Sequence, residues 1–78
     1  MISKYGQGIR VVVGYDNFGK FYKILKNGKF IGDVYISDDY FDGRPKKSYC
    51  ISSITDKEWN IKDLQDGINN LVLVADIH

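Results

Sequence analysis

The 78-residue sequence has one cysteine and one histidine, and each scarcity excludes a class of protein. Because Cys50 has no second cysteine to pair with, a small secreted domain held together by disulfides is excluded. Cys50 lies in an apolar stretch without a neighbouring basic residue, so we expect a buried thiol and not a nucleophile. His78 is the last residue given, where a side chain seldom keeps the fixed geometry of a general base.

Long hydrophobic runs are also missing. The longest apolar run, residues 71–75, is far shorter than the ~20 residues that span a bilayer. No apolar segment of signal-peptide type follows the first residues. We therefore expect a soluble, cytoplasmic protein that makes no contact with a membrane.

The composition is that of an ordinary globular protein, at 44% hydrophobic and 27% charged residues. A chain of this length predicts a single domain over residues 1–78. The net charge of +1 is unevenly spread: residues 1–30 carry six basic side chains and one acidic, whereas residues 31–45 carry four acidic and one basic. This balance is unlike that of a uniformly basic nucleic-acid-binding protein.

Short β-branched and aromatic runs, separated by turn residues, predict an antiparallel β-meander. The most specific signal is Asn27-Gly28, because a two-residue type I′ turn needs positive φ at both positions. This turn places residues 18–37 in a hairpin. The predicted fold is α+β, with one C-terminal helix packed on one face of four strands, at residues 8–15, 20–26, 29–37 and 48–54.

The start of the helix has two candidates. Thr55 and Glu58 have the spacing of a capping box, and residues 60–63 offer a second N-cap. The apolar stripe that predicts a helix to about Ala75 consists of Ile61, Leu64, Ile68, Leu71, Val72 and Ala75. Gly67 costs a helix roughly 1 kcal/mol relative to alanine. The alternative is therefore a shorter helix followed by a fifth strand at residues 71–77.

The predicted register of the hairpin sorts its side chains onto two faces. With Lys26 opposite Lys29, we expect Leu25 opposite Phe30, Ile24 opposite Ile31, Tyr22 opposite Asp33, Phe21 opposite Val34 and Lys20 opposite Tyr35. The first face, predicted to carry the core beneath the helix, holds Phe21, Leu25, Phe30, Val34 and Ile36. The second, predicted to face outward, holds Lys20, Tyr22, Lys26, Lys29, Asp33 and Tyr35, with Ile24 and Ile31 among them.

No motif predicts a catalytic residue, a metal site or a cofactor. Asp38, Asp39 and Asp42 lack the spacing and the closing glutamate of a calcium loop. The glycines of residues 6–8 follow no strand and open no helix, so they do not form a dinucleotide fingerprint. We therefore predict that the protein is not an enzyme.

Two features favour binding of a macromolecular partner. Lysines and tyrosines share the predicted outer face, and Tyr40 and Phe41 stand beside Arg44 in an acidic loop, where aromatic and arginine side chains are typical of interface hot spots. The main hypothesis is a non-enzymatic protein that binds a protein partner, for example a phage or mobile-element accessory protein that inhibits a host complex. The alternative is a single-stranded nucleic-acid-binding module. A homodimer would also account for the outer face. The residues predicted to bind the partner are Lys20, Tyr22, Lys26, Lys29, Tyr35, Tyr40, Phe41 and Arg44.

Overall fold

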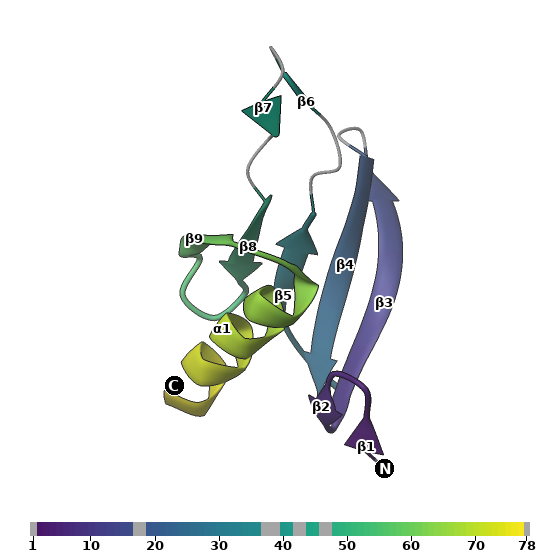
Figure 1. Cartoon of the computed structure of the whole chain (residues 1–78). Coiled ribbons are helices and arrows are strands. Elements are labelled where there is room, and N and C mark those ends of the chain that lie inside the picture. Colours follow the sequence, from purple (N-terminus) through teal and green to yellow (C-terminus); the bar gives the residue numbers. More distant parts are fainter. Residues whose placement is uncertain (1, 17–18, 37–39, 42–43, 46–47, 78) are drawn as a thin grey trace.

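Five antiparallel strands form the main sheet, and one C-terminal helix lies across one of its faces (Figure 1). In this computed structural model the order across the sheet is β3-β4-β5-β8-β9. The structure describes residues 2–16, 19–36, 40–41, 44–45 and 48–77. The elements are β1 (Ile2–Ser3), β2 (Gly6–Gln7), β3 (Ile9–Asp16), β4 (Gly19–Lys26), β5 (Lys29–Tyr35), β6 (Tyr40–Phe41), β7 (Arg44–Pro45), β8 (Ser48–Ser52), β9 (Glu58–Ile61) and α1 (Leu64–Ile77). The predicted α+β class and the helix are confirmed, whereas the predicted count of four strands is too low by one.

Two short hairpins lie outside the main sheet. β1 pairs with β2 near the beginning of β3, and β6 pairs with β7 at the opposite end of the molecule, away from α1 (Figure 1). The segment 38–47 was predicted to be a loop. It contains the β6–β7 pair, and its residues 38–39, 42–43 and 46–47 lie outside the described residues.

The central hairpin turns where the sequence predicts. Asn27 has φ 52° and Gly28 has φ 83°, as a type I′ turn requires. Lys26 stands opposite Lys29, and Leu25 stands opposite Phe30, so the first two predicted pairs are confirmed.

Beyond these two pairs the predicted register is wrong, because a β-bulge shifts it by one residue. Ile24 pairs with Gly32 instead of Ile31, and Tyr22 pairs with Val34 instead of Asp33. A bulge gives one strand an extra residue, which here is Ile31. The shift places Ile31 and Val34 in the same buried core as Ile24, although an odd spacing in a regular strand would put the two on opposite faces.

The bulge divides the face that was predicted to carry the core. Val34 is 0% exposed, as predicted, but Ile24 is 0% and Ile31 is 1% exposed although both were predicted to face outward. The predicted assignment is therefore wrong for β4 and for the beginning of β5. Phe30, predicted to be in the core, is 38% exposed. We name the side of the main sheet toward α1 the covered face and the opposite side the open face.

The fifth strand is β9, which the sequence had suggested as the start of the helix. Cys50 of β8 pairs with Trp59 of β9, so both side chains lie on the covered face. The connection between the strands is closed by backbone hydrogen bonds from Asp56 N to Ser52 O and from Ser52 N to Lys57 O, both of 3.0 Å. Thr55 and Glu58 therefore do not form a capping box.

The helix runs from Leu64 to Ile77, so the alternative of a strand at residues 71–77 is wrong. Of the second candidate segment, Asn60 lies in β9, and the helix begins only at the end of that segment. Asp63 is the N-cap: its Oδ1 accepts a hydrogen bond of 2.8 Å from the backbone N–H of Asp66. In return, Asp66 Oδ2 accepts a bond of 3.0 Å from the backbone N–H of Lys62. Gly67 is needed here, because a Cβ at this position would lie 3.0 Å from Val34 Cγ2. The helix therefore passes close to β5.

The core fills the space between α1 and the covered face of the main sheet. Every fully buried hydrophobic side chain among the described residues is aliphatic or is the thiol of Cys50, which confirms its predicted burial. The members are Ile9, Ile24, Ile31, Val34, Cys50, Ile68 and Leu71. Within the described ranges, no helix has the length and apolar character that crossing a bilayer requires.

Candidate functional site

The open face of the sheet is the surface that the described helix leaves uncovered (Figure 1). Its members follow from strand alternation, because Val34 and Cys50 point to the core and their neighbours in sequence point the other way. The pairings carry this alternation to all five strands. The open face thus holds Arg10, Val12, Gly14, Asp16, Phe21, Lys23, Leu25, Phe30, Asp33, Tyr35, Tyr49, Ile51, Glu58 and Asn60.

Three aromatic rings form a row across this face, which we call the aromatic row: Phe21, Tyr35 and Tyr49. Tyr35 and Tyr49 are cross-strand partners, and their rings stack with centroids 4.8 Å apart at an interplanar angle of 15°. The Phe21 ring follows at 5.8 Å from Tyr35, tilted by 34°. Such offset geometries stabilise aromatic pairs beyond the area they bury. The row is therefore a preformed apolar platform with two hydroxyl groups.

A glycine supports one end of the aromatic row. Gly14 of β3 stands opposite Phe21, and a Cβ on Gly14 would lie 2.5 Å from Phe21 Cζ. The ring therefore lies over the bare backbone of Gly14 and covers a position where a strand would otherwise lack a side chain.

The neighbouring row alternates apolar and charged side chains. Lys23 and Asp33 are cross-strand partners, and Ile51 stands opposite both Asp33 and Glu58 on its two sides. Burial raises the pKa of the Asp33 carboxyl, and the positive charge of Lys23 opposes this effect only in part. Asp33 Oδ1 is buried and accepts no hydrogen bond from the described residues. A buried oxygen that accepts no hydrogen bond costs free energy, so the Asp33 carboxyl destabilises the folded chain.

Burial and nearby carboxylates also affect the pKa values of the two tyrosines in the aromatic row. Burial raises the pKa of Tyr35, and the Asp33 carboxylate adds to the effect. Burial likewise raises the pKa of Tyr49, with Glu58 as the next cause. Both hydroxyls therefore remain protonated at neutral pH and can donate hydrogen bonds to a bound molecule.

The third row is the most exposed. Phe30 is 38% exposed, and Lys23 Nζ lies 5.5 Å from the centroid of its ring, within cation–π range. Leu25 stands opposite both Phe30 and Arg10, so these three side chains make up the row. Val12 of β3, in the neighbouring row beside Lys23, is 40% exposed. An apolar surface therefore continues from the aromatic row to the hairpin end of the sheet.

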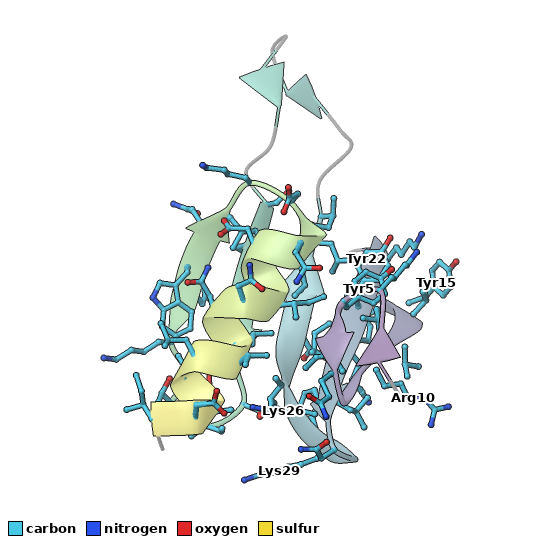
Figure 2. The ribbon with its side chains drawn as sticks, turned by 60° about the horizontal axis from the view of Figure 1, so that its bottom comes forward. Tyr5, Arg10, Tyr15, Tyr22, Lys26 and Lys29 are labelled. Carbon is cyan, nitrogen blue, oxygen red and sulfur yellow. The ribbon has the colours of Figure 1, made fainter. Side chains whose placement is uncertain are left out.

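The structure separates the residues predicted from the sequence to bind a partner. Lys20, Tyr22 and Lys26 lie on the covered side of β4, and Figure 2 shows Tyr22 and Lys26 there. Lys20 Nζ lies 5.1 Å over the ring of Tyr22, which is half-buried, and Lys26 forms an ion pair with Asp76 of α1. Lys29 is exposed beside the hairpin turn. Tyr35 lies on the open face. The predicted lysine–tyrosine surface is therefore divided between two sides of the sheet.

The loop residues of the prediction lie elsewhere. Tyr40 and Phe41 form β6 and Arg44 begins β7, with Phe41 opposite Arg44 in the backbone register. Their side chains lie outside the described part of the chain. The backbone places this hairpin away from the helix (Figure 1).

A groove of about 370 Å³ separates the β1–β2 hairpin from α1. Its floor is apolar, formed by Ile9, Ile68 and Val72, and Lys26 and Asp76 pair at its rim. Gln65 of α1 donates a hydrogen bond of 3.1 Å to the backbone oxygen of Tyr5, which ties the hairpin to the helix. The ion pair satisfies both charges at the rim, and Tyr5, Gln7 and Asn69 add neutral polar groups to the lining.

Nothing in the described chain forms a recognisable reaction centre. No three histidine, cysteine, aspartate or glutamate side chains of the described residues come together as metal ligands. Cys50 is fully buried, and burial raises the pKa of its thiol, while a backbone hydrogen bond from Trp59 lowers it only in part. His78 lies outside the described residues.

Comparison with known proteins gives no information on function, so function is inferred from the surface of this chain. No family model, no curated protein and no solved structure matches this chain.

The open face has four aromatic residues, and three of them were not assigned to a surface from the sequence. Phe21 and Phe30 were assigned to the core, and Tyr49 was assigned to no surface. A usable signal was present in β8, where Tyr49 and Ile51 alternate with the smaller Cys50 and Ser52. A helix packs closely against small side chains, whereas tyrosine keeps a polar tip that favours a wet surface.

Proposed function

We propose that this protein is a binding protein whose open sheet face engages a protein partner. The observation that carries the proposal is the aromatic row: three ordered rings, Phe21, Tyr35 and Tyr49, that no described segment covers. Tyrosine and phenylalanine are enriched in protein interfaces, and rigid rings lose little conformational entropy on binding. The exposed Phe30 extends the same apolar surface.

The charges of the open face favour a protein over a nucleic acid. Its described side chains include two basic residues, Arg10 and Lys23, against three acidic ones, Asp16, Asp33 and Glu58. Phosphate groups near Asp33 or Glu58 would be repelled, and electrostatic attraction to phosphate supplies most of non-specific nucleic-acid affinity. A mixed-charge rim around an aromatic centre is typical of protein interfaces.

The alternative of single-stranded nucleic-acid binding depended on lysines and tyrosines of one exposed face. Lys20 lies over the ring of Tyr22, and Lys26 is paired with Asp76. A base would have to displace the first contact in order to stack on Tyr22. No observation favours this alternative over the open face.

The test compares variants on the two sides of the molecule. The chain is immobilised and exposed to bacterial lysate, together with Phe30→Glu and Tyr35→Leu on the open face and Leu73→Glu on the helix. Leu73 is 59% exposed and serves as the matched control. Circular dichroism confirms that each variant is folded. We expect a protein that the wild type and Leu73→Glu retain equally and that both open-face variants lose at least about tenfold, the effect of a hot-spot truncation.

Three outcomes would overturn the proposal. The first is that no protein is retained specifically, and the second is that the open-face variants retain it as well as the wild type does. The third is a salt-sensitive shift of single-stranded oligonucleotides at ~50 mM salt, a condition that favours phosphate contacts, together with no retained protein. That result would transfer the function to nucleic-acid binding.

A further inference from the structure

The outer edge of β3 is an unpaired strand edge. β3 is the first strand of the main sheet, eight residues long, and among the described strands only β4 pairs along it. Val12, Val13 and Tyr15 are 40%, 46% and 77% exposed, and Figure 2 shows the Tyr15 side chain extending away from the ribbon. The opposite edge, β9, has only four residues. A long, exposed, β-branched edge is a template for another strand.

The hydrogen-bond phase of β3 identifies which backbone groups face outward. The N–H of Asn27 donates to the carbonyl of Gly8, just before the first β3–β4 pair. Hydrogen-bonded and non-hydrogen-bonded pairs alternate in an antiparallel ladder, so Arg10, Val12 and Gly14 bond to β4. The N–H and C=O groups of Val11, Val13 and Tyr15 consequently point to the outer edge.

This edge is complementary to itself. Arg10 and Asp16 are the two charged residues of β3, and they are equally distant from Val13. An antiparallel pairing of two β3 strands centred on Val13 puts Arg10 of each copy opposite Asp16 of the other. The same register puts Val11 opposite Tyr15 and Val13 opposite itself, so each of these outward residues meets an outward residue. Hydrogen-bond phase and charge therefore agree on one register.

Shifted registers lose this agreement. Centring the pair on Val12 keeps the hydrogen-bond phase but puts Arg10 opposite Gly14. Centring it on Gly14 puts Asp16 opposite Val12. A cross-strand pair of opposite charges contributes about 0.2–1 kcal/mol, and each is lost in these registers.

We propose that β3 joins two copies of this chain into a homodimer through antiparallel β3–β3 pairing centred on Val13. The two-fold axis is perpendicular to the sheet, so the five strands of each copy continue into one sheet. Both helices lie on one side of it and both open faces lie on the other. The paired edge leaves the aromatic row of each copy accessible, and the dimer presents two such rows on one surface.

The first test removes an outward hydrogen-bond donor. Val13→Pro deletes an N–H that points away from β4, and proline is tolerated on an edge strand at such a position. Sedimentation equilibrium of the full wild-type chain should show a concentration-dependent dimer. The Val13→Pro variant should be folded by circular dichroism and monomeric at the same concentrations. A wild-type chain that stays monomeric throughout would overturn the proposal, as would a Val13→Pro variant that dimerises normally.

The second test is specific for the register. Arg10→Glu alone sets Glu opposite Asp16, and Asp16→Lys alone sets Arg10 opposite Lys. Each variant should weaken its homodimer about tenfold or more, because two attractive pairs become repulsive. An equimolar mixture of the two variants should form a heterodimer of near wild-type affinity, since Glu then faces Lys and Arg faces Asp. Failure of the mixture to recover dimerisation would exclude this register, and a dimer unaffected by either variant would exclude the β3 edge.

Discussion

The covered and open faces of one sheet use different hydrophobic side chains. The covered face packs aliphatic residues such as Ile24 and Val34 against α1, and these are 0% exposed. The open face carries rings, and its members Phe21, Phe30, Tyr35 and Tyr49 are half-buried or exposed. Aliphatic side chains interdigitate densely between a sheet and a helix, whereas tyrosine keeps its hydroxyl in water. The covered side also carries Tyr22 and Trp59, but both are half-buried beside the core. The two faces therefore differ in their fully buried hydrophobic side chains, which are aliphatic or the Cys50 thiol and lie on the covered face.

The largest difference between the faces should appear in thiol reactivity. Cys50 is buried on the covered face with a raised pKa, so it should react only when the molecule opens. For a small domain of about 5 kcal/mol stability, this protects the thiol by roughly a thousandfold or more relative to the chain in urea. A Val12→Cys thiol on the open face, in a Cys50→Ala background, should react almost as fast as an unfolded chain. Equal rates for the two native proteins would contradict the distinction.

A pair of neighbours in β4 gives the next largest effect. Ile24 and Leu25 are adjacent in sequence and point to opposite faces. Ile24→Ala should lower the free energy of unfolding by about 3 kcal/mol, because it leaves a cavity in a closed core. Leu25→Ala should cost about 1 kcal/mol, since its site is half-buried and solvent can fill the space. Urea denaturation measures both. A larger loss for Leu25→Ala would restore the face assignment that the sequence suggested.

That assignment failed because of Ile31. Asn27-Gly28 correctly predicted the turn and the first two pairs, but a bulge after Phe30 shifts everything that follows by one residue. A one-residue shift moves a whole set of side chains to the other face. Gly32 was the available signal, because a glycine inside a strand often marks a bulge. The predicted site inherited the error: among its residues whose side chains the structure describes, only Tyr35 lies on the open face.

β9 was missed for a different reason. Glu58, Trp59, Asn60 and Ile61 alternate polar and apolar, which is the pattern of a strand with one buried face. The spacing of Thr55 and Glu58 suggested a helix start instead, and residues 60–63, with Asn60 and Asp63, offered a second start of the same kind. The strand pattern and the helix-start pattern are both present in the local sequence. The choice between them depends on β8, whose free edge accepts β9, and this is a tertiary contact that local sequence does not record.

The aromatic row can be disturbed without touching the core. In Gly14→Ala, the new Cβ would lie 2.5 Å from Phe21 Cζ, so the ring must turn away from β3. We expect a loss of about 1–2 kcal/mol, typical of inserting one methyl group into a filled space, and a changed near-ultraviolet circular dichroism signal. Adding Phe21→Leu should recover part of the stability but not the spectrum, because the smaller side chain makes room without restoring the ring.

The control for this change is Val12→Ala, in the same strand and on the same face but remote from the rings. It should alter stability slightly and leave the near-ultraviolet spectrum unchanged. If Gly14→Ala behaved in the same way, Phe21 would not lie against β3.

The smallest effect concerns the one carboxyl of the open face whose pKa burial raises most directly. Because the pKa of Asp33 is higher in the folded chain than its ordinary value of 3.8, ionisation of Asp33 opposes folding at neutral pH. The penalty is fully present above the folded pKa and disappears as the pH falls through that value to below 3.8.

Asp33→Asn should therefore stabilise the protein at pH 7 by no more than about 1 kcal/mol, since the Asp33 carboxyl is partly solvated. The difference between variant and wild type should shrink as the pH is lowered through this window, as followed by urea denaturation. Asp63→Asn offers a control at the helix N-cap, where asparagine also caps well, so little change in stability at pH 7 is expected. A stability difference for Asp33→Asn that is constant with pH would mean that this carboxyl is hydrated, and the open face would then be wetter at its centre than the aromatic row implies.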